Sequence, residues 1–478
     1  MLFSSIIFIG CFLPFILFIY YVILRNGNRL TKNCFLLLAS LAFYAWGEPL
    51  FVFMLIISFT GNWTFGLLVD KYKENRRAAW FFVVAMLIFN LSIFFIFKYL
   101  MFTAENLNLL FNTNLTVPLI ILPIGISFFT FQAISYVVDV YRGKRIVQKN
   151  LLNVGLYISF FPQLVAGPIV RYDTIADQIT GRQESFDSFS QGVCRFIVGL
   201  SKKVLLANNF AVIADKSFAV AQAGELSVSF AWLGAIAYMF QIYFDFSGYS
   251  DMAIGLGRMF GFKLPENFNY PYTAKSASEF WRRWHISLGS WFRDYVYFPL
   301  GGSRVSSKAR LAFNLFVVWL LTGVWHGANW TFICWGLLYF FFILFEKFSG
   351  FEKSAVPAVL KHVYVLFLVL LGWVLFRADT IADALSYLKV MFAISGNPWI
   401  CANAAVYLKE NLFYFLFGVV FSAPVAKTVS EKAENIGAES VRGMAVRAAY
   451  VFLFAAVFLI TASYLVKGTY NPFIYFNF

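Results

Sequence analysis

The sequence predicts an all-α, polytopic integral membrane protein, and three observations lead to this fold class. Of the 478 residues, 60% are hydrophobic, 21% are aromatic and only 13% are charged. Apolar runs of about 20 residues recur along the chain, and a helix of that length crosses the hydrocarbon core of a bilayer. These runs do not alternate between apolar and polar residues as the strands of a membrane barrel do. We therefore expect about eleven transmembrane helices plus re-entrant segments, because backbone groups in lipid must be satisfied internally.

Basic clusters in short loops orient the first spans. The first apolar run has no basic residue before it, so we expect a retained span and not a signal peptide. Clusters of Lys and Arg follow at 25–32, 71–77 and 142–145, whereas the loop at 104–116 contains neither residue type. Loops rich in Lys and Arg face the cytoplasm. The formal net charge of +14 therefore reflects topology and not nucleic-acid binding, and part of it would attract an anionic cytoplasmic ligand.

The remaining spans leave no room for a soluble domain. Residues 157–172 are apolar but short, and two prolines and a glycine interrupt them, which predicts a re-entrant segment. Five scattered cysteines show neither metal-ligand spacing nor a disulfide framework. We expect one membrane domain over 1–478, made of N-terminal spans at 1–150, a motif-bearing core at 151–390 and C-terminal spans at 391–478. Later spans are expected near 189–206, 228–248, 311–325, 330–346, 358–376, 409–426 and 446–466.

The stretch QIYFDFSGYSD, at 241–251, places carboxylates inside an apolar region. Gln241 and Asp245 are four residues apart and share a helix face, and the Ser and Gly residues that follow predict a break in the helix. Polar groups at membrane depth are costly and are therefore candidates for function. One role for Asp245 or Asp251 is to orient a catalytic histidine. The alternative is that they cap broken helices and tie neighbouring helices together.

A second stretch, PYTAKSASEFWRRWHISLGSWFRDYVYFPLGGSR at 271–304, combines tryptophans with cations. Ser276 and Glu279 have capping-box spacing, so a helix is expected to begin there and to end at Pro299. Guanidinium groups suit bidentate phosphate recognition; the alternative for the arginines is a girdle at the membrane interface. At helical spacing, one stripe is formed by Trp281, Trp284, Leu288, Trp291 and Tyr295, and an adjacent polar strip is formed by Arg282, His285, Gly289 and Arg293.

His326 stands within the largely apolar stretch LTGVWHGANW, at 321–330. About sixteen helical residues separate it from the basic cytoplasmic edge and rise about 24 Å, which places it deep in a hydrocarbon core of about 30 Å. Imidazole is the side chain best suited to move a proton near neutral pH, and Thr322 or Asn329 is expected to fix its tautomer. Gly323 and Gly327 leave space for another backbone or a substrate. The alternative is a core histidine that its neighbours satisfy.

Together these stretches resemble the membrane-bound O-acyltransferase (MBOAT) superfamily, and most of all its bacterial branch, typified by the membrane subunit of alginate O-acetyltransferase. The similarity covers much of the chain and is weaker over 390–478. The stretches that carry it are FYAWGEP (43–49), PIGISFFTFQAISYVVDVYRG (123–143), FFPQLVAGPIVR (160–171), FDFSGYSDMAIGLGRMFGF (244–262), EFWRRWHISLGSWFRDYVYFPLGG (279–302), LTGVWHGANWTFICWG (321–336) and WVLFRAD (373–379).

The resemblance implies an MBOAT fold and the transfer of an acyl group from a cytoplasmic donor to a hydroxyl. In this branch an acetyl group is passed across the membrane, and a separate extracytoplasmic acetyltransferase, often of the SGNH-hydrolase type, places it on a polysaccharide. The implied donor is acetyl-CoA, with no permanently bound cofactor and no metal. By similarity, His326 matches the catalytic histidine of the family, and His285 matches its second characteristic position.

Roles for individual residues follow from this resemblance and from their chemistry. We expect His326 to act as a general base on the acceptor hydroxyl or to carry the acetyl group covalently. We expect His285 to orient the thioester or to stabilise the oxyanion. The residues expected at the donor and substrate site are Arg282, Arg283, Arg293, Lys275, Asp245, Asp251, Trp325 and Asn329.

Two other functions fit parts of the sequence. A transporter or flippase of a lipid-linked glycan fits the broken helices and the basic cytoplasmic face, although no internal repeat is visible and the two histidines favour an enzyme. A family member that moves D-alanyl or fatty acyl groups fits the same motifs with a different cargo. The expected location is the bacterial cytoplasmic (inner) membrane, in contact with membrane lipid. Alginate, peptidoglycan and other exopolysaccharides all fit as the final acceptor.

Overall fold

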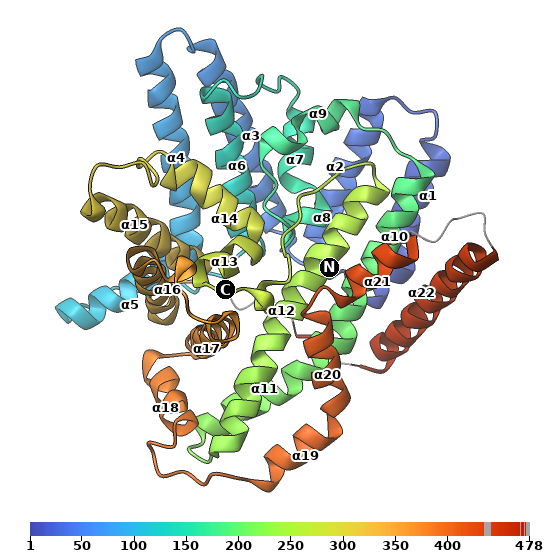
Figure 1. The fold of residues 1–478 in the computed structure, drawn as a ribbon. Helices are drawn as coiled ribbons and strands as arrows, with labels where there is room; N and C mark the ends of the chain where they lie inside the picture. Colours follow the sequence, from blue (N-terminus) through green and yellow to red (C-terminus); the bar gives the residue numbers. More distant parts are fainter. Residues whose placement is uncertain (435–440, 469, 473, 475–478) are drawn as a thin grey trace. The chain divides into compact units, whose positions relative to one another are not determined.

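The computed structural model describes residues 1–434, 441–468, 470–472 and 474. Every regular element in these residues is a helix (Figure 1), which confirms the predicted all-α class. Eight described helices are long and apolar enough to cross a membrane, so the molecule is a multi-pass integral membrane protein. The expectation of about eleven spans also counted shorter or more polar helices, such as α2 (Arg29–Ala45) and α12 (Val228–Met259).

The chain divides into two compact units. Unit 1 comprises Met1–Phe196 and Ser250–Pro265, and unit 2 comprises Ile197–Tyr249 and Glu266–Phe478. Helices α10 (Phe186–Ser201) and α12 contribute residues to both units. The other elements of unit 1, where η denotes a 3-10 or π helix, are η1 (Phe8–Phe12), α1 (Leu13–Phe18), η2 (Ile19–Ile23), α2, α3 (Phe51–Lys71), α4 (Arg76–Lys98), α5 (Leu100–Phe111), α6 (Ile126–Tyr141), α7 (Leu151–Ser159), α8 (Phe161–Leu164) and α9 (Tyr172–Gly181).

Unit 2 carries both histidines that the sequence singled out. Its other elements are η3 (Lys202–Ala207), α11 (Asn208–Gln222), η4 (Pro271–Thr273), α13 (Ala277–Arg283), α14 (Ile286–Phe292), η5 (Arg293–Tyr297), α15 (Lys308–His326), α16 (Trp330–Ser349), η6 (Phe351–Lys353), α17 (Ala358–Arg377), α18 (Ile381–Met391), α19 (Ala402–Glu410), α20 (Leu412–Phe421), α21 (Val425–Glu434) and α22 (Val441–Lys467).

In unit 1, the segment expected to be re-entrant is helical only in part. Helix α7 ends at Ser159, α8 covers 4 residues, and the backbone is then irregular until α9. All residues from 153 to 170 are buried, and the backbone N–H of Phe161 donates to the Ser40 hydroxyl at 3.0 Å. Protein therefore covers this irregular backbone, which is the condition for such backbone at membrane depth.

Helix α12 is continuous, so the break expected at 247–251 is wrong. The small residues there serve close packing instead. A Cβ added to Gly248 would lie 2.7 Å from the carbonyl oxygen of Gly199, so only glycine allows the two backbones to approach this closely. Small residues at helix contacts are typical of membrane proteins. A glycine between two polar residues thus marked a helix contact and not a helix end.

The helix expected from Ser276 begins as predicted. The Ser276 hydroxyl accepts a hydrogen bond from the backbone N–H of Glu279 at 2.9 Å and caps α13. This helix ends at Arg283, however, and α14 begins at Ile286, so the expectation of one helix extending to Pro299 is wrong.

The interruption between α13 and α14 lies at His285. Its backbone has a φ of 46°, in the left-handed region that residues other than glycine rarely adopt. Two hydrogen bonds hold the chain in this shape: the N–H of Asn269 donates to the carbonyl oxygen of Arg283 at 2.9 Å, and the N–H of Ile286 donates to that of Asn267 at 2.9 Å. The non-helical segment that contains Asn267 and Asn269 therefore determines where α13 ends.

Candidate active site

His326 is the last residue of α15, and a short turn joins it to α16. In that turn the Asn329 side chain accepts from the N–H of Thr331 at 3.1 Å and donates to the carbonyl oxygen of Asp379 at 2.8 Å. The Thr322 hydroxyl donates to the carbonyl oxygen four residues earlier, at 2.7 Å. Both side chains are thus engaged with backbone, as capping and helical residues of these types commonly are. These hydrogen bonds of Thr322 and Asn329 are all to backbone groups, so their role in fixing the tautomer of His326 stays a prediction.

Aromatic rings surround the imidazole of His326, which is 5% exposed. The centroids of the Trp325 and Trp335 rings each lie 4.9 Å from its centroid, and that of Phe376 lies 5.2 Å away. The nearby Gly323 receives the backbone of α16, because an added Cβ would lie 2.6 Å from a carbonyl oxygen of that helix. The space that this glycine leaves is therefore filled by protein.

Trp325 brings the two predicted histidines together. Its ring centroid lies 5.7 Å from that of His285 and 4.9 Å from that of His326. His285 is 2% exposed, and Phe246 of α12 contacts its ring at 4.6 Å. Burial lowers the pKa of His285 to about 3, so this imidazole is neutral near pH 7. A neutral imidazole can donate one hydrogen bond and accept another without a net charge.

A cavity of about 390 Å³ opens beside His285, and we call it the tryptophan cavity. The polar strip predicted from helical spacing lines it in full, even though the helix is broken. A Cβ added to Gly289 would meet only the carbonyl oxygen of Trp281, at 3.7 Å, so the cavity is open at this point. Its lining includes Trp281, Trp284, Trp319, Arg282, His285, Gly289, Arg293 and Lys347.

Three cations line the tryptophan cavity: Arg282, Arg293 and Lys347. The two arginines form ion pairs with Glu352 at 3.2 Å and with Asp294 at 2.9 Å, and their side chains are 63% and 55% exposed. An exposed pair of this kind contributes about 0–1 kcal/mol. An incoming anion can therefore compete for both guanidinium groups.

Two cations expected at the same site are not among the residues that line it. Arg283 forms an ion pair with Glu279 at 2.7 Å and ties α13 to the preceding loop. Lys275 lies before α13 and is exposed. Lys347 was missed, because at the end of a span it had the pattern of an ordinary cytoplasmic anchor. Its place on the cavity follows from the packing of α16 against α15.

The two carboxylates of the 241–251 stretch both form ion pairs. Asp245 lies 2.8 Å from the Lys203 ammonium, and both side chains are nearly inaccessible. In unit 1, Asp251 pairs with Arg195 at 2.6 Å. Because each carboxylate binds a cation from the preceding helical segment, the structure favours the alternative role of tying neighbouring helices over that of orienting a histidine.

A second cavity, of about 460 Å³, adjoins the rings around His326. Phe376, which contacts His326, lines this cavity together with Phe332, and the centroids of their rings lie 4.9 Å apart. Residues near the C-terminus form part of its wall, so we call it the tail cavity. Its lining includes Tyr238, Gln241, Asn329, Thr331, Phe332, Phe376, Arg377, Pro472 and Ile474.

The buried pair on η3 and α12 holds the C-terminal wall in place. The Lys203 ammonium donates to the carbonyl oxygen of Pro472, and Asp245 accepts from the N–H of Ile474 at 3.0 Å. The Tyr470 hydroxyl donates to Asp215. Sequence reasoning missed this arrangement because the C-terminal residues follow the last apolar run and show no helical period.

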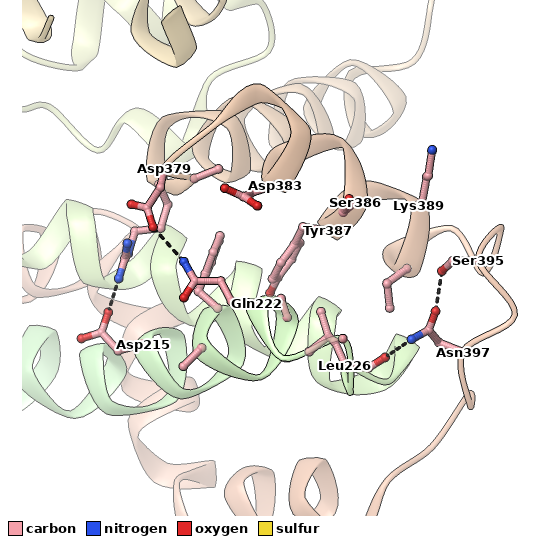
Figure 2. Close-up of a pocket in the computed structure, with 17 residues that line it drawn as sticks. Asp215, Gln222, Leu226, Asp379, Asp383, Ser386, Tyr387, Lys389, Ser395 and Asn397 are labelled. Carbon is pink, nitrogen blue, oxygen red and sulfur yellow. Dashed lines mark hydrogen bonds and ion pairs between the residues drawn. The ribbon is translucent and has the colours of Figure 1, made fainter. Parts of the chain in front are cut away.

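A third cavity, of about 350 Å³, is contiguous with the tail cavity and is shown in Figure 2. Asp215, Arg377, Ala378 and Asp379 line both cavities. Arg377 pairs with Asp215 at 2.8 Å, and Gln222 donates to Asp379 at 2.7 Å. The ion pair therefore marks the boundary between this outer space and the tail cavity.

Comparison with known proteins identifies the family of this chain. The family model described as MBOAT, membrane-bound O-acyltransferase family, matches residues 144–376, which include both histidines. The chain is 42% identical over 400 residues to the probable alginate O-acetylase of Pseudomonas aeruginosa, covering 82% of this chain and 75% of that protein. It is 37% identical over 431 residues to the peptidoglycan O-acetyltransferase of Helicobacter pylori, covering 83% and 80%.

A more distant relative is the teichoic acid D-alanyltransferase of Bacillus subtilis. It is 30% identical over 243 residues, which cover 48% of this chain and 60% of that protein. The resemblance found in the motifs is thus confirmed over most of the sequence, and the enzyme interpretation is confirmed with it. The chain belongs to the membrane-bound O-acyltransferase family, on the side of its alginate O-acetylase relatives, and it is an O-acyltransferase.

Proposed function

We propose that this protein transfers an acetyl group from cytoplasmic acetyl-CoA across the bacterial inner membrane to an extracytoplasmic partner, such as an SGNH-type acetyltransferase, which O-acetylates a cell-surface polysaccharide. The observation that carries the proposal is a pair of cavities near the two histidines. One is lined by cations and reaches His285, and the other adjoins Phe376. A cross-membrane transfer needs two such approaches to one histidine.

Charge distribution supports the direction of transfer. Helix α15 begins beside the basic residues at 304–310, and α16 ends beside Lys347, so these ends face the cytoplasm by the positive-inside rule. The turn after His326 lies at the opposite end of both helices, where the Asn329 amide bonds to the backbone of Asp379. The tryptophan cavity would thus receive a cytoplasmic donor, and the tail cavity would open toward the other side.

The tryptophan cavity has the chemistry that acetyl-CoA requires. Arg282, Arg293 and Lys347 would bind its phosphates, because cations at a partly open mouth hold phosphate by charge and by hydrogen bonds. The thioester would then extend toward His285, whose neutral ring would donate a hydrogen bond to the carbonyl oxygen and to the oxyanion that forms from it. His285 and Trp325 would thus position the acetyl group.

His326 would activate the acceptor. As a general base, its unprotonated ring nitrogen would accept the proton of the acceptor hydroxyl while the oxygen attacks the thioester carbon. The carbon–sulfur bond then breaks, and the proton passes to the departing CoA thiolate, leaving an ester and CoA. In the covalent version, His326 carries the acetyl group between two such steps. Because His326 is only 5% exposed, Trp325 or Phe376 must shift during each cycle.

The relatives support the type of reaction more closely than they support the identity of the acceptor polymer. The relatives at 42% and 37% identity are named for O-acetylation of alginate and of peptidoglycan, whereas the D-alanyltransferase matches less than half of this chain. This order supports an acetyl group over D-alanine as cargo and a polysaccharide of the cell envelope as the final acceptor.

A transport assay with the purified protein tests the proposal. Proteoliposomes would receive [¹⁴C]acetyl-CoA on the face that exposes the tryptophan cavity, with a small alcohol on the other face. We expect label to leave CoA and to appear as an ester, and we expect His326→Ala to slow this by 10²- to 10⁴-fold while keeping the thermal stability of the fold. Wild-type rates in His326→Ala, or movement of the alcohol without loss of label from CoA, would contradict the proposal.

A further inference from the structure

Three polar groups on the wall of the tail cavity are buried without a protein partner. They are the hydroxyl of Tyr238, the side-chain carbonyl oxygen of Gln241 and the hydroxyl of Thr331, and none has a hydrogen-bond partner among the described residues. The three side chains are 1%, 4% and 0% exposed. They come from α12 and from the first turn of α16, so two separate elements bring them to one cavity.

Such an arrangement costs stability. Each buried polar group without a partner costs about 1–3 kcal/mol, and an apolar side chain of the same shape avoids that cost. Phe in place of Tyr, or Val in place of Thr, would keep the packing of these helices. Three such groups share one cavity, next to a ring that contacts His326. Their polar atoms are therefore suited to hydrogen-bond a ligand that enters this cavity.

The chemistry of the three groups selects their ligand. A phenol hydroxyl donates, an amide both accepts and donates, and an alcohol hydroxyl does both, and none of them carries a charge. Of the charged residues of the same cavity, Arg377 pairs with Asp215 at 2.8 Å, and Asp379 accepts a hydrogen bond from Gln222 at 2.7 Å, so the described residues of the cavity offer no unpaired cation to an anion. The site therefore suits a neutral hydroxyl group, which needs one acceptor for its proton and one or two donors for its oxygen, better than an anion.

We propose that Tyr238, Gln241 and Thr331 bind the acceptor alcohol in the tail cavity and direct its hydroxyl toward His326. This proposal rests on the function proposed above and names the residues that recognise the second substrate. Phe332 and Phe376 form the apolar part of the same cavity and separate the bound alcohol from the imidazole until the rings move. Acceptor recognition is thus kept apart from the cations that hold the donor.

Steady-state kinetics with a defined probe tests the assignment. The full-length protein in proteoliposomes would transfer label from [¹⁴C]acetyl-CoA to methyl α-D-mannopyranoside, a small neutral alcohol, at varied concentrations of each substrate. We expect Tyr238→Phe and Thr331→Val each to raise the KM for the mannoside by about tenfold, the effect of one lost buried hydrogen bond. The KM for acetyl-CoA should stay within twofold of the wild-type value.

Thermal unfolding separates recognition from a structural role. Because both substitutions remove a polar group that the protein does not pair, the melting temperature of each variant without mannoside should equal or exceed that of the wild type. Tyr339→Phe is the matched control: its buried hydroxyl also has no hydrogen-bond partner among the described residues, but Tyr339 is not among the residues that line the tail cavity, and its KM values should not change.

The possible failures are distinguishable. If the wild type released no CoA from acetyl-CoA, the proposed function itself would fall, and this assignment with it. If the wild type released CoA but never esterified the mannoside, the tail cavity would not be an alcohol site. An unchanged mannoside KM in both variants, or a lower melting temperature together with parallel rises in both KM values, would overturn the assignment alone.

Discussion

The tryptophan cavity is lined by His285, and the tail cavity is lined by Phe376, which contacts His326; the two cavities differ in charge and in the elements that form them. Among the described residues, the walls of the tryptophan cavity hold three cations and no carboxylate. The tail cavity holds the ion pair between Arg377 and Asp215, Asp379 and three neutral polar groups, and Pro472 and Ile474 form part of its wall. In the proposed function, this difference would let one buried histidine serve two substrates: charge would select the donor in one cavity, and neutral hydrogen bonds would select the acceptor in the other.

Aromatic rings bury His326 and separate it from both cavities. Trp325 contacts both histidines, and Phe376 contacts His326 and lines the tail cavity. Water in either cavity therefore meets an aromatic ring before it meets the imidazole. Exclusion of water protects a reactive acyl group from hydrolysis. In the proposed function, this protection would require Trp325 or Phe376 to move before each transfer.

The largest predicted effect concerns the buried ion pair that supports only the tail cavity. Lys203→Met would leave Asp245 charged and unpaired in the interior, which typically destabilises a protein by about 3–5 kcal/mol. It would also release the carbonyl oxygen of Pro472 from its donor. We expect a lower melting temperature and a loss of transfer to the mannoside, whereas binding of acetyl-CoA should persist in the protein that remains folded.

The double variant makes this prediction sharper. Lys203→Met combined with Asp245→Leu removes both charges and should recover most of the lost stability, since an apolar pair can replace a buried ion pair. It should not recover transfer to the mannoside, because Pro472 and Ile474 then lack the side chains that hold their backbone groups. Lys216→Met, at an exposed position of α11, is the control and should change neither quantity. Full activity in the double variant would show that the wall does not need this pair.

The second predicted effect is the pH dependence of stability that His285 causes. Burial lowers its pKa to about 3 in the folded protein, from about 6.5 in the unfolded chain. The unfolded state therefore binds an extra proton as pH falls below about 6.5, so this residue lowers the stability of the native state progressively down to about pH 3. His285→Asn lacks that proton and tolerates the left-handed backbone at this position.

We therefore expect His285→Asn to gain stability relative to the wild type as pH falls. The gain should be near zero at pH 8 and about 2 kcal/mol at pH 5, as measured by denaturant or thermal unfolding at the two pH values. The pH dependence of transfer between pH 6 and 8 should keep its shape, because a neutral His285 does not titrate there. A stability difference that stays constant with pH would mean that this imidazole is hydrated and carries its ordinary pKa.

The sequence predicted the parts of this molecule that depend on local pattern. Apolar length predicted the spans, Ser276 predicted the start of α13, and both histidines were singled out before their contact through Trp325 was known. The helical spacing of Arg282 and Arg293 also placed them correctly on one cavity, although the helix itself is interrupted.

The failures share one cause, which is that tertiary contacts overrode local pattern. The break at His285 is held by backbone hydrogen bonds with Asn267, which accepts, and with Asn269, which donates, and helical periodicity does not predict such partners. Gly248 had the signature of a helix end but receives a neighbouring backbone. The C-terminal wall of the tail cavity depends on Lys203, which lies more than two hundred residues earlier in the chain. A lysine in an apolar run indicates a buried charge, but the sequence does not show which residue binds it.

The smallest predicted effect tests the charge difference between the two cavities directly. Lys347→Ala and Arg293→Ala should each raise the KM for acetyl-CoA by about 3- to 10-fold, roughly 1 kcal/mol, because these side chains are partly exposed and their contacts with phosphate are screened by water. The KM for the mannoside should not change. Added salt should weaken acetyl-CoA binding in the wild type more than in either variant, since fewer charges are left to screen.

The same measurement decides between the cations expected from sequence and those placed by the structure. Lys275 was expected at the donor site, but it is not among the residues that line the tryptophan cavity, so Lys275→Ala should bind acetyl-CoA as the wild type does. Acetyl-3′-dephospho-CoA adds a second comparison, because a cation that meets the 3′-phosphate loses its effect with this donor. If Lys275→Ala raised the KM and Lys347→Ala did not, the donor would approach α13 from its outer face, and the contrast between the two cavities would no longer describe how the enzyme tells its substrates apart.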